Sequence, residues 1–303
     1  MQPLMPDSIS VDEISLPAWQ QKNILVHVLR LDKIHPVISG NKWFKLKYYL
    51  QDAQQQYKNT LVTFGGAYSN HLVATAAAGK LYNFKTIGLV RGEEPQSYSH
   101  SLQQCVQHGM ELIFLSRDDY RQRKIPAGLL TDAYVLTDAY IINEGGYGQL
   151  GAKGAAEILD LCTKNFYTHI CSAVGTTTMM VGIIQAMNAW QKMVGISVLK
   201  NNTELSASLL NLLPENDRQK NICILHNYHL GGYAQKTAEL INFMNEFYLA
   251  TSIPSDFVYT GKLFFAVNHL ISSGFFPAAS KILLIHSGGL QGNLSVEKGT
   301  LIF

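Results

Sequence analysis

Short runs of apolar and β-branched residues alternate along the chain with longer stretches of helical periodicity. The strand-like runs cover 24–29, 61–64, 86–90, 112–115, 140–143, 170–173, 194–199, 222–226 and 282–286, and the helical stretches cover 41–55, 70–81, 99–108, 151–162, 178–193 and 232–248. Several of the runs are continuously apolar, which is typical of strands covered on both faces by helices. Repeated strand, turn and helix predicts an α/β fold with mainly parallel sheets.

Length and composition narrow the class of protein. The chain has 303 residues, which at about 150 residues per domain suggests two lobes or one large α/β domain. Hydrophobic residues make up 47% and charged residues 15%, so the chain has enough apolar surface to fold. Lysine and arginine (24) nearly balance aspartate and glutamate (22) without a basic run. That balance argues against a nucleic-acid partner and favours small molecules.

No membrane-spanning helix, targeting segment or metal site is expected from the sequence. The first 20 residues lack a basic segment followed by an apolar one, and no apolar run approaches the roughly 18 residues that a membrane-spanning helix needs. Cys105, Cys162, Cys171 and Cys223 are scattered, with no CxxC pair and no zinc-finger spacing. They are predicted to be buried, reduced thiols in a cytoplasmic protein without a metal site.

Glycine turns directly follow four of the strand-like runs. They are Gly65–Gly66, Gly145–Gly146, Gly175 and Gly288–Gly289. In open α/β sheets ligands bind at the carboxyl ends of the strands, so four such turns predict one ligand cleft. The alternative is that each glycine only permits a tight turn from strand to helix.

A lysine follows a Gly-Asn turn at the start of the 41–55 helix, in the sequence Ser39-Gly-Asn-Lys42-Trp-Phe-Lys. A buried lysine loses its charge easily, and a neutral amine can form a Schiff base with an aldehyde cofactor. The alternative is a surface helix with Lys42, Lys45 and Lys47 in water. A Ser-x-x-Lys acyl-enzyme motif is excluded because the chain lacks the Ser-Asp-Asn and Lys-Thr-Gly that accompany it.

Two further turns open helices with hydroxyl and amide side chains. Ser69-Asn70-His71 offers donors for an anion such as a carboxylate, although Ser and Asn are also preferred helix caps. Gly175 is followed by Thr176, Thr177 and Thr178, a pattern that favours phosphate binding at a helix N-terminus. The P-loop ending Gly-Lys-Ser/Thr is absent, so the predicted phosphate is a monoester.

A competing signal is Gly146-Tyr-Gly148-Gln-Leu-Gly151, which fits the GxGxxG dinucleotide pattern. The acidic residue expected about 20 positions later, at the end of the next strand, is missing because that strand reads 169–174, His-Ile-Cys-Ser-Ala-Val. This absence weakens the dinucleotide interpretation. An oxidoreductase of Rossmann type that binds NAD(P) nevertheless stays an alternative.

Two late segments place polar side chains beside glycine turns. Tyr259 precedes Thr260-Gly261-Lys262 and a new helix, and Ser287 follows the last strand at His286-Ser-Gly-Gly. Each is also compatible with ordinary turn chemistry.

Taken together and in this order, these motifs resemble one family: the pyridoxal-phosphate enzymes comprising 1-aminocyclopropane-1-carboxylate (ACC) deaminase and D-cysteine desulfhydrase. The resemblance spans residues 42–289. It implies the tryptophan synthase β-like fold (fold type II), with two open, mainly parallel sheets flanked by helices. It also implies a large domain of residues 1–48 and 155–303, a small domain of residues 49–154, and a homodimer.

The resemblance further implies pyridoxal 5'-phosphate as cofactor and a role for each motif. Lys42 would hold the cofactor covalently and then act as base. Ser69 would contact the carboxylate of a small amino-acid substrate, and Asn70 the phenolic oxygen of the cofactor. The remaining cofactor contacts would be Gly175, Thr176, Thr177 and Thr178 to the phosphate and Ser287 to the pyridine nitrogen, with Tyr259 and Tyr233 facing the substrate.

Within this family, two positions favour desulfhydrase activity over ACC deaminase activity. ACC deaminases have Glu after Val-Tyr and Gln after Ser-Asn, where this chain has Thr260 and His71. At the pyridine nitrogen of the cofactor, a neutral hydroxyl would stabilise the carbanion less than a carboxylate does. Weaker stabilisation suits β-elimination of a good leaving group. The chain departs from the family at Leu31, at Thr178-Met179 and at 231–234, Gly-Gly-Tyr-Ala. ACC deaminase activity and a non-catalytic binding protein therefore stay as alternatives.

Overall fold

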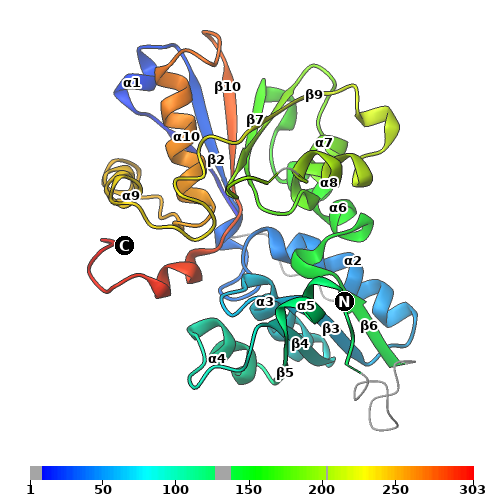
Figure 1. The fold of residues 1–303 in the computed structure, drawn as a ribbon. Helices are drawn as coiled ribbons and strands as arrows, with labels where there is room; N and C mark the ends of the chain where they lie inside the picture. The colour runs from blue at the N-terminus through cyan, green and yellow to red at the C-terminus, as the bar shows by residue number, and fades with distance from the viewer. Residues whose placement is uncertain (1–8, 127–137, 203) are drawn as a thin grey trace.

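The computed structural model describes residues 9–126, 138–202 and 204–303, and it contains two sheets flanked by helices (Figure 1). The six-stranded sheet has the order β1 (Val11–Ile14), β2 (Leu25–Arg30), β10 (Lys281–His286), β7 (His169–Val174), β8 (Lys192–Ser197) and β9 (Asn221–Leu225). The four-stranded sheet has the order β5 (Met110–Leu115), β4 (Lys85–Arg91), β3 (Thr60–Gly65) and β6 (Ala139–Ile142). Only the β1–β2 pair is antiparallel among the described strands, so the predicted fold class is confirmed.

The strands form where the continuous apolar runs were predicted, because helices cover both faces of the central ones. Every residue of β3 and of β7 is buried. β1 was not predicted, since its sequence Val-Asp-Glu-Ile carries two acidic residues and only its last residue is buried. As an edge strand it needs no second apolar face.

The helices are short, and some of them begin at a side-chain cap. They are α1 (Pro17–Gln20), α2 (Asn41–Gln55), α3 (Asn70–Tyr82), α4 (His100–Gln107), α5 (Arg117–Arg121), α6 (Gln149–Ala156), α7 (Thr178–Ala186), α8 (Leu205–Leu212), α9 (Ala238–Thr251) and α10 (Thr260–Ser272). Side chains of Ser69, Ser99 and Thr237 accept backbone N–H bonds at the starts of α3, α4 and α9.

Two predicted helices were too long. The helix predicted over 178–193 ends at Ala186, because Met187 is extended and β8 begins at Lys192. The helix predicted over 232–248 begins only at Ala238, because Gly231 and Gly232 have φ of +93° and +121° and form a turn. Neither boundary was revealed by the hydrophobic pattern alone.

Helix α2 connects the two sheets. It packs on α6 and α3, and a Cβ atom at Gly154 of α6 would lie 1.9 Å from the backbone oxygen of Phe44 in α2. Glycine therefore permits the close approach of these helices. The largest apolar cluster includes Leu61 of β3 and Leu283 of β10, so residues from both sheets share one core. The domain division at residues 48/49 and 154/155 stays a prediction.

The cysteines carry free thiols. Cys105 and Cys171 are buried, whereas Cys162 and Cys223, which were also predicted to be buried, are only partly so. Across the described ranges the structure has no helix long and apolar enough to span a membrane. Residues 1–8 of the segment inspected for a targeting signal lie outside the described residues.

Candidate active site

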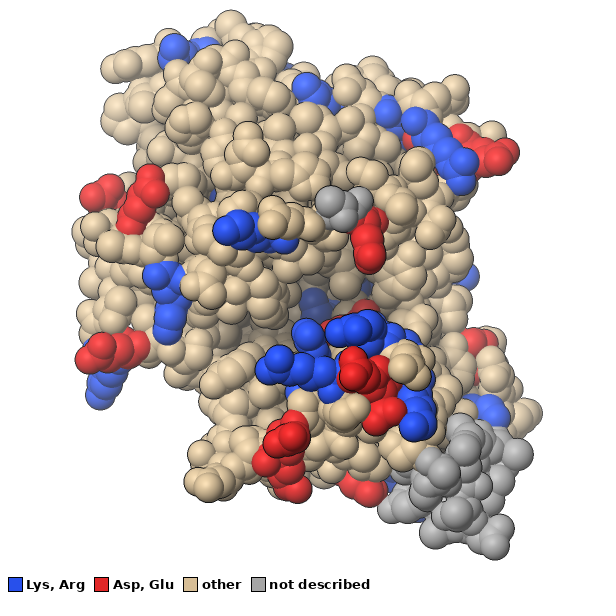
Figure 2. Space-filling view, in the orientation of Figure 1, with Lys and Arg blue, Asp and Glu red and all other residues tan. Residues whose placement is uncertain are grey.

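One cavity of about 600 Å³ gathers most of the predicted site residues. Its lining includes Lys42, Ser69, Asn70, Gly175, Thr176, Tyr233, Tyr259 and Ser287. Thr177 and Thr178 are fully buried and are not among the described residues that line it. Figure 2 shows this face of the molecule hollowed between its two halves, with basic side chains along the edge nearest the four-stranded sheet. The volume is typical of a small-molecule site.

Lys42 lies in the first turn of α2, beside the turn that follows β10. The backbone N–H of Asn41 donates to the Ser287 carbonyl oxygen at 3.1 Å. Gly40 has φ of +63°, and a Cβ atom there would lie 1.9 Å from that same oxygen, so this approach requires glycine. The Lys42 amine donates to Asn41 Oδ1 at 2.9 Å. Burial lowers its pKa to about 8, although the Asp256 carboxylate partly opposes the shift.

Lys45, one turn further along α2, also lines the cavity and was not predicted as a site residue. It is 2% exposed, and its Nζ donates to the Gly145 carbonyl oxygen at 3.2 Å and to Thr176 Oγ1 at 3.1 Å. Burial holds its pKa well below the usual lysine value, and Lys42 adds to this effect. The alternative of a solvated lysine face is therefore wrong for Lys42 and Lys45. The spacing of three residues, which places both on one helix face, was the available signal.

The Ser69-Asn70-His71 turn serves both the helix and the cavity. Ser69 Oγ accepts the Leu72 N–H at 3.3 Å and caps α3. Asn70 Oδ1 is buried without a hydrogen-bond partner among the described residues. The ring of His71 is buried, with Nε2 2.9 Å from Thr63 Oγ1, and burial lowers its pKa well below 6.5. His71 is therefore a neutral side chain beside the two lysines.

The glycine–threonine turn connects β7 to α7. Thr176 meets Lys45 at the cavity, whereas Thr177 Oγ1 lies 3.3 Å from Ser208 Oγ and Thr178 Oγ1 is buried without a partner among the described residues. Of the three threonines, only Thr176 thus presents its side chain to the cavity. Met179, at the position that departs from the family pattern, also lines the cavity and accepts a hydrogen bond from Asn41.

Tyr259 and Tyr233 close another side of the cavity. Their hydroxyl oxygens are 3.5 Å apart, and burial raises the pKa of Tyr259 well above 10. The buried carboxylate of Asp256 accepts the N–H groups of residues 258, 259 and 260 and the Thr260 hydroxyl. Thr260 is thus fully buried and bound to its own turn. Both tyrosines remain neutral hydrogen-bond donors near pH 7.

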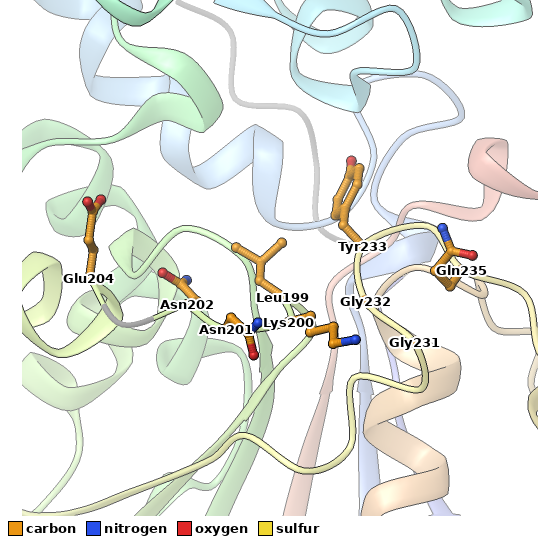
Figure 3. Close-up of a pocket in the computed structure, with 9 residues that line it drawn as sticks. All are labelled: Leu199, Lys200, Asn201, Asn202, Glu204, Gly231, Gly232, Tyr233 and Gln235. Atoms are coloured by element: carbon orange, nitrogen blue, oxygen red, sulfur yellow. The ribbon is translucent and has the colours of Figure 1, made fainter.

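A second opening, of about 510 Å³, adjoins the first because Leu199 and Tyr233 line both. Figure 3 shows the Tyr233 ring directed away from the other side chains of this opening. Lys262 of α10 holds the turn that carries Tyr233. Its buried Nζ donates to the Gly232 carbonyl oxygen at 2.6 Å.

The GxGxxG pattern has a packing role here. The strands before and after it, β6 and β7, belong to different sheets, so no βαβ nucleotide-binding unit forms around it. Gly148 and Gly151 instead permit close contacts: a Cβ atom would lie 2.4 Å from the Tyr49 hydroxyl oxygen or 2.2 Å from the Gly146 carbonyl oxygen. The dinucleotide interpretation is not supported.

Comparisons with known proteins agree with the cavity chemistry. A bifunctional D-cysteine desulfhydrase/ACC deaminase of Arabidopsis thaliana is 27% identical over 284 residues, covering 84% of this chain and 70% of the relative. An ACC deaminase of a Bradyrhizobium species is 25% identical over 285 residues, covering 83% and 82%. The crystal structure of an ACC deaminase homologue superposes with a TM-score of 0.81 at 24% identity, covering 96% and 92%.

A protein-family comparison matches most of the chain. Residues 14–288, from the end of β1 to the turn after β10, match the family described as "Pyridoxal-phosphate dependent enzyme". This range contains every residue of the candidate site described above except Gly289 and Gln291 on the cavity wall. The resemblance read from the motifs and the predicted cofactor are thereby confirmed. The chain belongs to the family of pyridoxal-phosphate dependent enzymes.

Proposed function

We propose that this enzyme eliminates a thiol from the β-carbon of a small amino acid, as a D-cysteine desulfhydrase does. With cysteine and water as reactants, the products are hydrogen sulfide, ammonia and pyruvate. The observation that carries the proposal is the Ser287 side chain on the cavity wall, since the nearby carboxylates of Asp32 and Asp256 lie behind that wall and are bound to other groups. Among the described residues of the cavity wall, the only carboxylate is Glu144, which pairs with Arg123 at 2.8 Å and is 40% exposed.

The residues of the cavity fit pyridoxal phosphate. An amine with a pKa of about 8 suits an aldehyde. Lys45, Thr176 and the start of α7 suit a phosphate monoester. The unpartnered, buried Asn70 Oδ1 is free to meet a polar group, and a Cβ atom at Gly66 would meet only open space within 4 Å. Ser287 would provide a hydroxyl for the ring nitrogen.

When bound, the cofactor supplies an electron sink for the bond breaking at the α- and β-carbons. The protein's part is to hold the substrate and move its protons. Lys42 Nζ takes the proton from the substrate α-carbon, since its lowered pKa leaves a useful fraction of neutral amine near pH 7. Ser69 binds the substrate carboxylate. Tyr259 and Tyr233 remain protonated and offer hydroxyls to the leaving group.

A neutral hydroxyl at the ring nitrogen supports one of the two activities named among the relatives. A carboxylate there would keep that nitrogen protonated and deepen the electron sink. Opening a cyclopropane ring, which requires breaking a carbon–carbon bond, depends on that deeper sink. Loss of a thiolate does not, because thiolate is a good leaving group. Ser287, on a cavity wall whose one described carboxylate is Glu144, therefore favours β-elimination over ACC deamination.

Substrate profiling tests the proposal directly. The purified holoenzyme is incubated with D-cysteine, L-cysteine, D-serine and ACC, and sulfide, ammonia and 2-oxo acid are measured. We expect sulfide, ammonia and pyruvate in equal amounts from one cysteine enantiomer and little product from ACC. Ammonia and 2-oxobutyrate from ACC alone would instead establish ACC deaminase activity. Full cofactor content without turnover of any amino acid would support a non-catalytic binding protein.

Covalent loading of the cofactor should depend on pH in a specific way. Only the neutral Lys42 amine attacks the aldehyde, and its pKa is lowered to about 8. The loading rate of cofactor-free enzyme should therefore rise about tenfold per pH unit below pH 8 and level off above it. Stopped-flow absorbance between pH 6 and pH 10 measures this rate, with N-acetyl-lysine as control. A rate that keeps rising to pH 10 would show an ordinary lysine.

Assembly and location are proposed from the resemblance alone. We propose a homodimer in the cytoplasm, as the family resemblance implies. Light scattering of the purified holoenzyme measures the assembly, and a monomer at micromolar concentration would contradict it.

A further inference from the structure

A buried chain of charged groups lies behind the turn that carries Ser287. Arg30, at the end of β2, is 6% exposed, and its guanidinium binds both carboxylate oxygens of Asp32, with N–O distances of 2.8 Å and 2.6 Å. This bidentate geometry is the strong form of an ion pair. The Arg30 pairing holds the pKa of the Asp32 carboxyl below its usual value despite burial, and His286 adds to the effect. Asp32 is therefore an anion at the end of the sheet.

His286 is the next member of this chain. The parallel register of β2 and β10 places Arg30 opposite His286, and the fully buried imidazole points back towards Asp32. Its Nδ1 lies 3.3 Å from Asp32 Oδ1. Its Nε2 lies 2.8 Å from the Pro254 carbonyl oxygen, which can only accept, so Nε2 carries a proton. Each ring nitrogen thus lies within hydrogen-bond distance of an oxygen of a neighbouring residue.

The same imidazole touches the turn of the candidate site. The backbone nitrogen of Gly288 lies 3.3 Å from His286 Nδ1, which can accept this N–H only when it is not itself donating to Asp32, and Gly288 has φ of +76°. Between them stands Ser287, whose side chain is at the cavity and whose carbonyl accepts the Asn41 N–H beside Lys42. The Asp32 backbone carbonyl also accepts the Ser39 hydroxyl at 3.4 Å. Arg30, Asp32 and His286 therefore connect to both turns that carry Ser287 and Lys42.

We infer that Arg30, Asp32 and His286 are positioning residues, which fix the Ser287–Gly288 turn against the cofactor ring. This inference rests on the proposed role of Ser287 but adds residues to which no motif assigned a function. Arg30 orients the Asp32 carboxylate, the carboxylate and the Pro254 carbonyl hold the two ring nitrogens of His286, and the imidazole fixes the end of β10, from which Ser287 follows. Small displacements of such a turn lower the catalytic rate strongly, since misplacing a reacting group by about 1 Å can reduce the rate by roughly 10²-fold.

The test compares Asp32→Asn with Asp12→Asn. Both variants remove a carboxylate from Arg30, because Asp12 Oδ2 lies 3.0 Å from Arg30 Nη1. Only Asp32 also contacts His286. Three quantities are measured on each purified holoenzyme well below its unfolding temperature. They are the visible absorption maximum of the bound cofactor, the rate of cofactor dissociation, and kcat/KM per bound cofactor.

We expect Asp32→Asn to shift the absorption maximum, to speed cofactor dissociation, and to lower kcat/KM by roughly 10- to 100-fold. Asp12→Asn should leave all three unchanged, although both variants lower Tm. His286→Gln, which keeps an amide donor for Pro254, is the second variant and should produce the same three changes. It also provides the test if Asp32→Asn does not fold. The inference is overturned if both Asp32→Asn and His286→Gln lower Tm but keep the wild-type spectrum, dissociation rate and kcat/KM. The spectrum and dissociation rate need no substrate, so they decide this question even if the proposed reaction is wrong.

Discussion

Replacing Lys42 by alanine should lower kcat by at least about 10³-fold and abolish covalent retention of the cofactor. The amine has two uses in the proposed reaction, attachment of the aldehyde and proton transfer, and proton transfer by a positioned side chain alone contributes roughly 10² to 10⁴-fold. Turnover of the best amino acid from the substrate panel gives the first measurement. Borohydride reduction followed by peptide mapping gives the second, with the reduced adduct expected on the peptide that contains Lys42 in the wild-type enzyme.

The matched control is Lys47→Ala. Lys47 is on the same helix but its amine pairs with Glu157 Oε2 at 2.6 Å, outside the cavity wall as described. This variant should keep wild-type turnover and the reduced adduct. An adduct that survives in Lys42→Ala with undiminished turnover would place the covalent chemistry at another lysine and contradict the site described above.

Replacing Lys45 by methionine should raise the dissociation constant of pyridoxal phosphate by about 10- to 150-fold. The reason is the phosphate: a hydrogen bond to a charged group contributes about 1.5–3 kcal/mol, and 1.4 kcal/mol is tenfold in affinity. Without an anion, burial disfavours the charged form of Lys45. A phosphate restores that charge, so binding takes up a proton and should weaken as pH rises.

Equilibrium titration of the cofactor-free enzyme measures this effect. Pyridoxal, which lacks the phosphate, is the matched ligand, and its affinity should be the same for Lys45→Met and the wild-type enzyme. Methionine keeps the length and apolar stem of lysine, so packing is largely preserved. Equal losses for the two ligands would show that Lys45 shapes the cavity without binding the phosphate.

The fold was largely predictable from the order of apolar runs and glycine turns. Strand positions came out within one or two residues because the central strands are buried on both faces, which makes their sequences continuously apolar. The C-terminal end of α7 and the start of α9 were not predictable in the same way. The turn at Gly231–Gly232 depends on positive φ and on the buried Lys262, and neither leaves a periodic signal.

The site was predictable where a residue type has few other uses. Lys42 after a Gly-Asn turn is such a case. Lys45 was missed because a lysine in a helix is usually solvated, and its spacing of three residues from Lys42 was not used; the contacts with Gly145 and Thr176 show its burial. The hydroxyls of Thr177 and Thr178 lie outside the cavity wall, since three adjacent hydroxyls cannot all face one cavity when they begin a helix. Their contact with a phosphate stays a prediction.

The contact between Asn41 and Ser287 also bears on when the enzyme becomes competent during its synthesis. β10 is the last strand to leave the ribosome, yet it inserts between β2 and β7 in the middle of the six-stranded sheet. Until then, the helix of Lys42 has no turn to begin against, and β2 has no parallel neighbour. A growing chain therefore cannot assemble the cofactor pocket in stages. A complete cofactor pocket therefore requires a chain that has been made through β10.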